Sequence, residues 1–293
     1  MSVQLLSGKE RSKVLVDHFK QAITKLNKYQ VTPKLVVVTV GEDPASKVYV
    51  GQKQKKAIGI GMAFDWITLP EDTTQETLSA QIDALNKDDA VSGMIVQFPL
   101  PKHLSEKQVK EEIAPSKDVD GFHSYNVGQL VANDATVVAC TPKGIVNLLE
   151  HYQIKKKKKN ITIVGRSQIV GLPLSLLLTH LNGTVTVCHT RTADLKAHTR
   201  NADIVISAVG RAGTITADHL KEGAVVIDVG INRLPNGKLT GDVNYDEVFE
   251  KVSAITPVPG GVGPMTVAML MEQTIICACL QHNLNPAEYL GRD

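Results

Sequence analysis

Aromatic residues are scarce in this sequence, which has one Trp, six Tyr and five Phe among 293 residues. A chain so poor in aromatic side chains offers little material for the stacking platforms that bind single-stranded nucleic acid. An excess of one charge is also absent, since 32 Lys and Arg stand against 30 Asp and Glu for a formal net charge of +2. Without a strongly positive field, binding to nucleic acid or to an anionic membrane surface is not expected.

Cysteine is rare as well. The four cysteines include no Cys-x-x-Cys pair and no nearby histidine at metal-ligand spacing; they are Cys140, Cys188, Cys277 and Cys279. Neither a disulfide framework nor a metal site is therefore expected, and a reducing cytoplasm is the expected location. The chain also lacks an apolar run long enough to span a bilayer and the hydrophobic core of a signal peptide, so no membrane association is expected.

A strand–turn–helix pattern stands just past the midpoint, in residues 161–173. It opens with a β-branched run that is typical of a strand buried on both faces, and this run stops at Gly165. Arg166 and Ser167 follow, and Gly171 precedes a run of leucines typical of a helix. Backbone N–H groups in such a turn, with the positive end of the helix, can bind a diphosphate. The spacing is not the usual Gly-x-Gly-x-x-Gly fingerprint, and close packing of helix on strand explains such glycines equally well.

Strands and helices alternate along the chain. Strands are expected at 35–40, 62–69, 91–98, 161–164, 184–189, 204–209 and 224–229. Between the early strands we expect a helix over about 42–58, and Thr73 with Glu76 has the spacing of a capping box that opens the next one. This alternation predicts an α/β fold with parallel sheets covered by helices on both faces.

The pattern loosens over residues 123–139, which are the best candidate for a domain boundary. Thr141 and the proline after it have the chemistry of a new helix start, and that helix ends near Tyr152. The lysine run 155–159 is either an anion-binding patch or, more simply, a solvated turn. After the last strand and loop, a long apolar helix from Met265 to about Leu280 is expected to cross back to the first domain.

Four polar side chains lie where open α/β sheets bind ligands, at the carboxyl ends of strands in the first domain. Tyr49 and Lys53 are four residues apart and hence on one face of a helix. Gln97 ends a buried strand, and Asp120 stands in a turn. Each also has a structural explanation: a surface tyrosine, a solvated lysine, a strand-end cap and an Asx-turn.

Five motifs occur in a fixed order. They are Ser-x-x-Tyr-x-x-x-Lys at 46–53, Gln-Phe-Pro-Leu-Pro at 97–101, Asp-Val-Asp-Gly at 118–121, Gly-Arg-Ser-x-x-Val-Gly at 165–171 and Pro-Val-Pro-Gly-Gly-Val-Gly-Pro-Met-Thr at 257–266. Together they resemble the bifunctional methylenetetrahydrofolate dehydrogenase/methenyltetrahydrofolate cyclohydrolase family of the bacterial FolD type, over essentially the whole chain. Each motif alone is modest evidence for this family, but the five motifs in this order are highly specific for it.

The resemblance implies an enzyme of one-carbon metabolism and purine biosynthesis. It would oxidise 5,10-methylenetetrahydrofolate to the methenyl cation by hydride transfer to NADP, and then hydrolyse that cation to 10-formyltetrahydrofolate. It implies two lobes, with residues 1–139 and 266–293 as a folate-binding catalytic domain and residues 140–265 as a Rossmann-like NADP-binding domain. A shared active site in the interdomain cleft and a homodimer, with no metal, are also implied.

The resemblance further assigns roles to the four polar residues. Tyr49 would offer a flat face to the folate ring system, and Asp120 an acceptor for the paired N–H donors of the pterin. Lys53 matches the catalytic lysine that handles protons and activates water, and Gln97 the residue that holds it; burial beside a cationic ligand would favour the neutral amine. The substrate loop would comprise Pro259, Gly260, Gly261, Val262, Gly263 and Pro264.

The cofactor residues combine sequence reasoning with the resemblance. A site for NAD usually has an acidic residue at the end of the second strand, whereas this strand is followed by Thr190 and Arg191. These two side chains and Arg166 can hold a 2′-phosphate, which favours NADP, while Asp194 keeps NAD as an alternative. By resemblance, the cofactor contacts are Gly165, Arg166, Ser167, Thr190, Arg191 and Ile231.

Two other functions are compatible with the same motifs. One is a dehydrogenase without cyclohydrolase activity, against which the intact set Tyr49, Lys53, Gln97 and Asp120 argues. The other is a non-catalytic dinucleotide sensor that has kept the fold. A degenerate site is expected of a sensor, and this one is complete.

Overall fold

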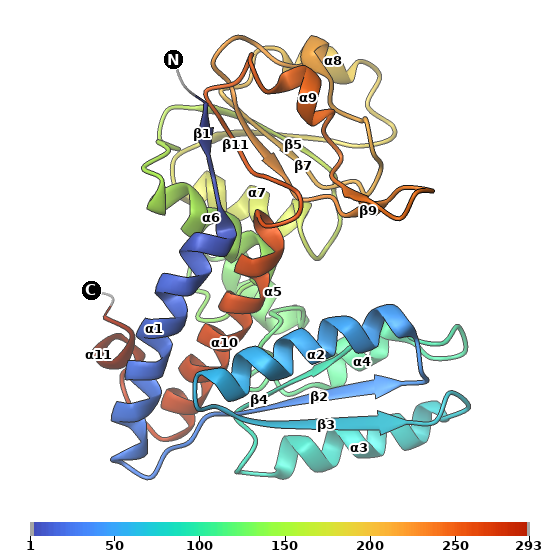
Figure 1. Cartoon of the computed structure of the whole chain (residues 1–293). Coiled ribbons are helices and arrows are strands. Elements are labelled where there is room, and N and C mark those ends of the chain that lie inside the picture. Colours follow the sequence, from blue (N-terminus) through green and yellow to red (C-terminus); the bar gives the residue numbers. More distant parts are fainter. Residues whose placement is uncertain (1–2, 292–293) are drawn as a thin grey trace. The chain divides into compact units, whose positions relative to one another are not determined.

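The computed structural model describes residues 3–291. Contacts divide the chain into two compact units: unit 1 contains Met1–Lys13 and Ala139–Thr266, and unit 2 contains Val14–Val138 and Val267–Asp293. In both units parallel strands alternate with helices (Figure 1), which confirms the α/β class expected from the sequence.

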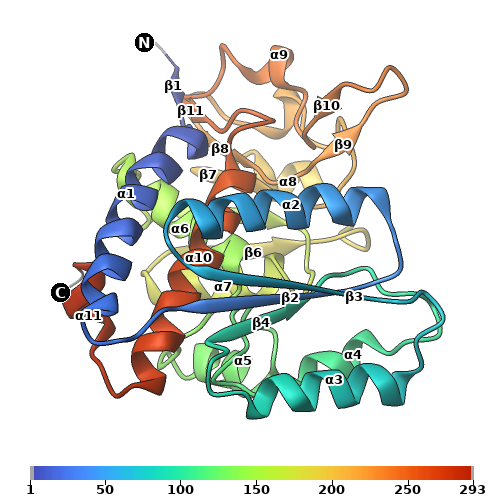
Figure 2. The same ribbon diagram turned by 60° about the horizontal axis from the view of Figure 1, so that its bottom comes forward.

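Unit 2 is built on a three-stranded parallel sheet with the strand order β3-β2-β4. The strands are β2 (Lys34–Val40), β3 (Ala63–Leu69) and β4 (Gly93–Val96). Helix α2 (Pro44–Gly59) covers one face, while α3 (Gln75–Lys87) and α4 (Glu106–Glu112) cover the other (Figure 1, Figure 2). Residues 35–38 are buried, because a parallel sheet covered on both faces leaves its central strand no exposed side.

Four further helices complete the unit or link it to its neighbour in the chain. They are α1 (Gly8–Asn27), α5 (Ser124–Val131), α10 (Val262–Gln281) and α11 (Pro286–Leu290). Helix α10 begins in unit 1 and continues in unit 2 from Val267, as expected for the last long helix. In unit 2 the buried Gln273 of this helix donates to the carbonyl oxygen of Val119 (2.6 Å) and accepts from the backbone N–H of Val138 (2.9 Å).

Helix α10 is long and apolar enough, by length and composition, to cross a membrane, and it alone has this property among residues 3–291. The sequence-based expectation that no apolar run reaches such a length is therefore wrong for this helix. Most of its residues are buried inside the structure, as in the core helix of a globular protein.

Unit 1 contains a six-stranded parallel sheet with the order β1-β11-β8-β7-β5-β6. Its strands are β1 (Gln4–Leu5), β5 (Asn160–Val164), β6 (Thr184–Cys188), β7 (Ile204–Ser207), β8 (Val225–Asp228) and β11 (Ala254–Ile255). The last residues of β5, β7 and β8 are register partners, since Val164 pairs with Ser207 and Ser207 with Asp228. The loops that follow these strands consequently leave the sheet at the same edge.

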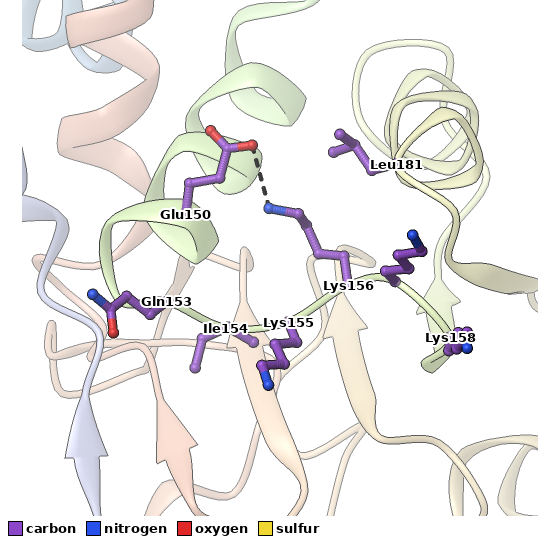
Figure 3. A pocket seen from close by; sticks show the side chains of 8 residues that line it. Glu150, Gln153, Ile154, Lys155, Lys156, Lys158 and Leu181 are labelled. Carbon is purple, nitrogen blue, oxygen red and sulfur yellow. Dashed lines mark hydrogen bonds and ion pairs between the residues drawn. The ribbon is translucent and has the colours of Figure 1, made fainter.

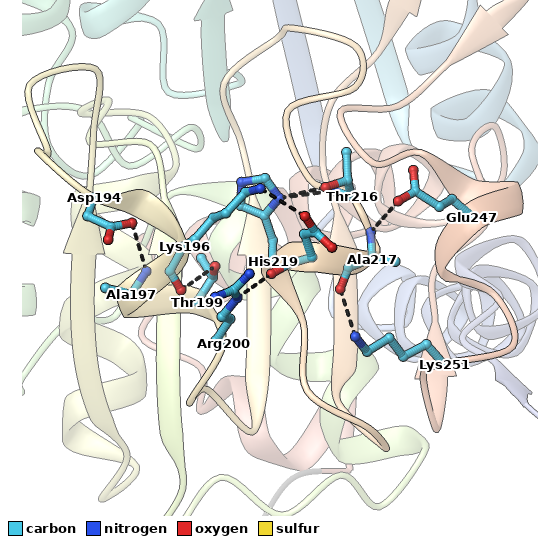
Figure 4. Close-up of polar contacts among 11 residues, drawn as sticks. Asp194, Lys196, Ala197, Thr199, Arg200, Thr216, Ala217, His219, Glu247 and Lys251 are labelled. Atoms are coloured by element: carbon cyan, nitrogen blue, oxygen red, sulfur yellow. Dashed lines mark hydrogen bonds and ion pairs between the residues drawn. The ribbon is translucent and has the colours of Figure 1, made fainter.

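The helices of unit 1 are short. They are α6 (Cys140–His151), α7 (Gly171–His180), α8 (Leu195–Thr199), the 3-10 turn η1 (Ala217–His219) and α9 (Tyr245–Val248), and β9 (Asn232–Arg233) pairs with β10 (Leu239–Thr240) as an antiparallel hairpin. A polar network joins α8, η1 and α9 (Figure 4). In it Lys196 donates to Asp218 (3.0 Å), and Glu247 accepts from the backbone N–H of Ala217 (3.0 Å).

Two predicted helix starts are wrong, the first by one residue and the second by two. Thr74 rather than Thr73 caps α3, because the Thr73 hydroxyl donates to the carbonyl oxygen of Pro70 (2.6 Å) instead. Helix α6 begins at Cys140 rather than after Thr141, whose hydroxyl forms a hydrogen bond with another side chain. Thr73 therefore bonds within its own turn and Thr141 bonds a residue far along the chain, so neither hydroxyl caps the predicted helix start.

The unit limits differ in part from the predicted domain limits. Residues up to Lys13 belong to unit 1, because β1 pairs with β11, whereas the sequence pattern placed them with the first domain. A two-residue strand has no hydrophobic periodicity that could reveal it. The loosened segment 123–139 contains helix α5, and the change of unit comes at its end, at Ala139.

Candidate functional site

Helix α2 in unit 2 carries two of the predicted site residues. The side chain of Asp43 caps its start by accepting from the backbone N–H of Ser46 (2.7 Å), and Pro44 occupies the first turn. Tyr49 is 45% exposed, so a large aromatic face is available to a ligand. Lys53, one turn further along the same side of the helix, is only partly exposed.

The structure brings Lys53 and Gln97 together. The ammonium Nζ of Lys53 donates to Oε1 of Gln97 across 2.9 Å. Gln97 extends β4 by donating its backbone N–H to the carbonyl oxygen of Val38 (2.8 Å), while its Nε2 donates to the carbonyl oxygen of Phe98 (2.7 Å). The amide is therefore fixed with its oxygen toward the lysine, and Gln97 can hold the lysine nitrogen in one place.

The turn that carries Asp120 is organised by another aspartate. Asp118 is buried and accepts from the backbone N–H groups of Gly121 (3.0 Å) and His123 (2.8 Å) and from Nδ2 of Asn126 (2.9 Å). The carboxylate of Asp118 thus organises this turn. Sequence reasoning did not give Asp118 this role, although an aspartate shortly before a glycine is typical of turns.

Asp120 itself is partly buried and lines a small cavity of about 10 Å³. Phe98, Lys110 and Phe122 also line it, and the Lys110 ammonium lies 5.0 Å from the centre of the Phe98 ring and 5.7 Å from that of Phe122. This cation–π arrangement joins the segment after Gln97 to the segment after Asp120. Asp120 and Gln97 thereby belong to connected loops.

These loops lie at one edge of the unit 2 sheet. Helix α2 follows the carboxyl end of β2, Gln97 follows that of β4, and the 118–120 segment runs parallel to β4 through the bridge between Met94 and Asp118. The carboxyl edge of a parallel sheet is where α/β proteins bind ligands. An amine, an amide and a carboxylate with an exposed aromatic ring at this edge can bind a flat polar ligand and exchange protons with it.

In unit 1 the glycine turn after β5 is closely packed. A Cβ atom on Gly165, whose φ is +128°, would overlap the carbonyl oxygen of Ala208, and one on Gly171 would overlap that of Gly165. Arg166 and Ser167 between them are exposed. The glycines therefore allow close packing of helix on strand, and they also leave the turn and the start of α7 open to a phosphate group. Both explanations considered from the sequence, packing and phosphate binding, apply.

The turn after β6 lies next to this glycine turn. The backbone N–H of Gly165 donates to the carbonyl oxygen of Cys188 (2.8 Å), and Thr190 and Arg191 are exposed immediately beyond. Two arginines, Arg166 and Arg191, therefore stand on neighbouring loops. Asp194 caps α8 by accepting from the backbone N–H of Ala197 (3.1 Å). This structural role explains the aspartate without a contact to the ribose of NAD.

Two further predicted segments belong to unit 1. Ile231 follows β8 and is 48% exposed, as a cofactor contact requires. In the 259–264 loop, Gly260 has a φ of +105° and open space beside it. Gly261 instead packs against Pro257, and Val262 is buried, so these two residues contribute packing.

The lysine run lines a shallow hollow of about 550 Å³ on unit 1 (Figure 3). Lys156 turns toward Glu150, with 3.2 Å between Nζ and Oε1, while Lys155 and Lys158 point elsewhere (Figure 3). Side chains that diverge in this way are typical of a solvated turn.

The part of the chain that the structure describes provides no candidate metal centre. Within residues 3–291, no group of three or more His, Cys, Asp or Glu side chains is placed to hold a metal ion. The four cysteines are buried as free thiols.

Comparison with known proteins gives one family for both units. Family models match residues 6–120, described as "Tetrahydrofolate dehydrogenase/cyclohydrolase, catalytic domain", and residues 139–282, described as "Tetrahydrofolate dehydrogenase/cyclohydrolase, NAD(P)-binding domain". The bifunctional protein FolD of Staphylococcus epidermidis is 48% identical over 284 residues, which cover 97% of this chain and 99% of that protein.

Solved structures agree with this result. The bifunctional FolD dehydrogenase/cyclohydrolase of Campylobacter jejuni superposes with a TM-score of 0.93 at 44% identity, covering 94% of this chain and 99% of that one. The Trypanosoma brucei methylenetetrahydrofolate dehydrogenase-cyclohydrolase, solved with NADP cofactor and an inhibitor, gives a TM-score of 0.90 at 33% identity, covering 95% and 98%.

Proposed function

The chain belongs to the tetrahydrofolate dehydrogenase/cyclohydrolase family, and we propose that it carries out both reactions. It oxidises 5,10-methylenetetrahydrofolate to 5,10-methenyltetrahydrofolate with NADP as hydride acceptor, and it hydrolyses the methenyl cation to 10-formyltetrahydrofolate. The observation that carries the proposal is the 2.9 Å hydrogen bond from Lys53 to Gln97, beside the exposed ring of Tyr49.

The hydrolytic step needs a proton acceptor at the methenyl carbon. One water adds to that carbon, the carbon–N5 bond breaks, and one proton is released in the net reaction. Lys53 takes the proton of the attacking water as a neutral amine, and a cationic substrate next to its nitrogen favours that neutral form. Gln97 fixes the lysine nitrogen through its amide oxygen, which makes the proton transfer directional.

Binding of the folate uses the remaining predicted residues of unit 2. Tyr49 presents its ring for stacking, a contact that contributes roughly 0.5–1.5 kcal/mol beyond the area it buries. Asp120, on a turn fixed by Asp118, accepts the paired N–H groups of the pterin edge. We also assign Pro259, Gly260, Gly263 and Pro264 to the substrate loop, whose open conformation at Gly260 supports close approach of a ligand.

The residues of unit 1 fit NADP. When bound, this cofactor supplies the acceptor for the hydride. The packed glycines Gly165 and Gly171 clear the turn for the diphosphate, Ser167 and the start of α7 offer hydrogen-bond donors, and the exposed Thr190, Arg191 and Arg166 provide the hydroxyl and cations that a 2′-phosphate requires. Ile231 covers the nicotinamide end. Asp194 is engaged at the start of α8, which argues against NAD.

Replacement of Lys53 tests the central role. In Lys53→Met we expect hydrolysis of methenyltetrahydrofolate to fall by at least about a hundredfold, since general-base catalysis typically contributes about 10²- to 10⁴-fold. The rate is followed by loss of the methenyl absorbance. Lys55→Met is the matched control, because Lys55 is exposed on the same helix and should leave the rate unchanged. Full hydrolytic activity in Lys53→Met would exclude the proposed role.

An assay of the wild-type protein distinguishes the bifunctional enzyme from a dehydrogenase alone and from a non-catalytic sensor. With 5,10-methylenetetrahydrofolate, NADP reduction with little methenyl accumulation supports the bifunctional enzyme, and reduction with stoichiometric methenyl build-up would indicate a dehydrogenase alone. Tight binding of NADP without reduction would indicate a sensor. Faster turnover with NAD than with NADP would contradict the cofactor assignment.

We further propose a cytoplasmic homodimer. Four buried free thiols fit a reducing compartment. Strand β6 lies at the edge of the unit 1 sheet and is only partly buried along its middle, so it can receive a second copy. Light scattering on the purified protein measures its mass in solution, and a monomer at all concentrations would contradict the dimer.

A further inference from the structure

Two aspartates are buried in unit 1 and have no part in the proposed reaction. Asp228, the last residue of β8, is 4% exposed, and Asp242, just beyond β10, is fully buried. No Lys or Arg side chain donates to either carboxylate in any hydrogen bond recorded for the described residues. Burial of two carboxylates is costly unless hydrogen bonds replace their water.

Most of the hydrogen bonds that the Asp242 carboxylate accepts come from backbone N–H groups. Oδ2 accepts from the N–H groups of Val209 (2.8 Å) and Gly210 (3.3 Å), and Oδ1 accepts from that of Arg211 (2.8 Å). The Ser207 hydroxyl donates to Oδ2 as well (3.2 Å). One carboxylate therefore accepts from four of the five residues 207–211, at the end of β7 and in the loop after it; the exception is Ala208.

The same carboxylate reaches a second loop. Nδ2 of Asn232 donates to Oδ1 of Asp242 (3.0 Å), and Asn232 directly follows Ile231. A Cβ atom on Gly230, the residue before Ile231, would overlap this carboxylate, so the backbone there passes directly over it. Ile231 is thus flanked on both sides by residues that contact Asp242.

Asp228 holds Asp242 itself in place. Its Oδ1 accepts from the backbone N–H of Asp242 (2.8 Å) and of Gly230 (3.2 Å), and its Oδ2 accepts from that of Val243 (3.0 Å). A Cβ atom on Gly241 would overlap the Asp228 carboxylate. The two carboxylates thus cross-link β8, the segment after β10 and the loop after β7.

The loops so held are the ones that border the cofactor residues. Ala208, inside the segment bound by Asp242, is the residue against which Gly165 packs. Ile231 is the residue assigned to the nicotinamide end, and Ser207 and Asp228 are register partners at the carboxyl edge of the sheet. The carboxylates lie beneath this edge and face its loops from inside the protein.

We propose that Asp242 is a positioning residue for NADP: it fixes the 207–211 loop and the 230–232 segment in the conformation that receives the nicotinamide half of the cofactor. This inference rests on the proposed function of unit 1. Asp242 acts through the backbone of these two loops and does not touch the cofactor.

Asp242→Asn is the sharpest test, because it keeps the size of the side chain. One of its oxygens becomes an NH₂ group that faces N–H donors, which removes acceptors from at least one loop. We expect the KM for NADP and the Kd for NADPH, measured by fluorescence titration, to rise about tenfold or more, with a smaller change in kcat. Hydrolysis of methenyltetrahydrofolate, which uses Lys53, should stay within about twofold of the wild-type rate.

Asp203→Asn is the matched control. Asp203 precedes the same strand β7 at its opposite end, where it accepts from the backbone N–H of Asn160 (2.8 Å) and from Lys221 (2.8 Å). The variant also removes a hydrogen-bonded carboxylate from this sheet, but it should leave NADP affinity unchanged. Ser207→Ala, which deletes a single donor to Asp242, provides a milder variant should Asp242→Asn fail to fold. It should raise the KM in the same direction, about twofold to fivefold.

The outcomes separate this inference from the proposed function. Unchanged NADPH affinity in folded Asp242→Asn, or an equal loss in Asp203→Asn, would overturn the positioning role. Loss of hydrolysis together with NADPH affinity would show a general structural role instead and would also overturn it. A wild-type protein that binds NADPH without catalysing either reaction would refute the proposed function, while the NADPH titrations of the variants would still decide the role of Asp242.

Discussion

At the scale of single residues, acceptors and donors decide which side chains belong to a site. Gln97 and Asp118 illustrate this, because the side chains of both are held by several hydrogen bonds. Gln97 directs its amide oxygen to Lys53, whereas Asp118 uses its carboxylate on its own turn. The first is therefore a candidate for chemistry and the second supports its neighbour Asp120.

Arg191 gives a residue-scale prediction for cofactor choice. In Arg191→Ala we expect the KM for NADP to rise about tenfold to a hundredfold, because a charge-assisted contact to the 2′-phosphate is lost, while the KM for NAD changes little. Steady-state assays with both cofactors measure the two values. Arg200→Ala is the control, since Arg200 is an exposed arginine whose Nε donates to a backbone carbonyl of Asp218. A parallel rise for NAD would show that Arg191 does not recognise the phosphate.

At the scale of elements, hydrophobic patterns in the sequence predicted most strands and long helices. They did not predict the short strands and the hydrogen bonds that depend on residues far away in the sequence. The β-branched runs of β2 and β5 are buried on both faces, so composition alone identifies them. The two-residue strands β1 and β11 depend on pairing with distant segments, β1 with β11 and β11 also with β8, and no local signal marks them. The same limit applies to the site: the spacing of Tyr49 and Lys53 places them on one face, but nothing local shows that Asp242 binds the loop after β7.

The strand–turn–helix element gives a prediction about stability. Gly165→Ala forces a Cβ into the Ala208 carbonyl oxygen at a φ of +128°, so we expect the free energy of unfolding to fall by about 2–4 kcal/mol. Gly213→Ala is the control, because Gly213 has a φ of +71° but open space beside it. There only backbone strain remains, about 1 kcal/mol. Denaturant titration compares the two, and equal losses would mean that the packing against Ala208 is not tight.

At the scale of the whole molecule, the two proposed activities draw on different units. Hydrolysis depends on Lys53 and Gln97 in unit 2, while cofactor binding depends on the glycine turn and the buried aspartates of unit 1. Variants of unit 1 can therefore reduce oxidation and leave hydrolysis intact. In a variant of unit 1, hydrolysis therefore reports that unit 2 is still folded, and in a variant of unit 2 NADPH binding reports the same for unit 1.

Asp228 links the stability of the protein to pH. Burial raises the pKa of this carboxyl to about 6, from an ordinary value of 3.8. Between these values the folded state binds more protons than the unfolded state, so the contribution of Asp228 to stability is lost as pH rises through about 6. The hydrogen bond with Lys221 lowers the pKa of Asp203, so the stabilising effect of Asp203 is lost only as the pH falls below the ordinary pKa of an aspartate. Asp203 therefore does not mask the effect of Asp228 near pH 6.

The comparison of wild type with Asp228→Asn isolates this effect, because all other titrating groups are shared. From pH 7 to pH 5 we expect the free energy of unfolding of wild type to increase relative to the variant by about 1 kcal/mol, since one pKa unit corresponds to about 1.4 kcal/mol. Denaturant titrations at the two pH values measure the change. A difference that is constant with pH would show that Asp228 is already ionised at pH 5 in the folded protein. In that case its three backbone N–H partners would outweigh burial in setting its pKa.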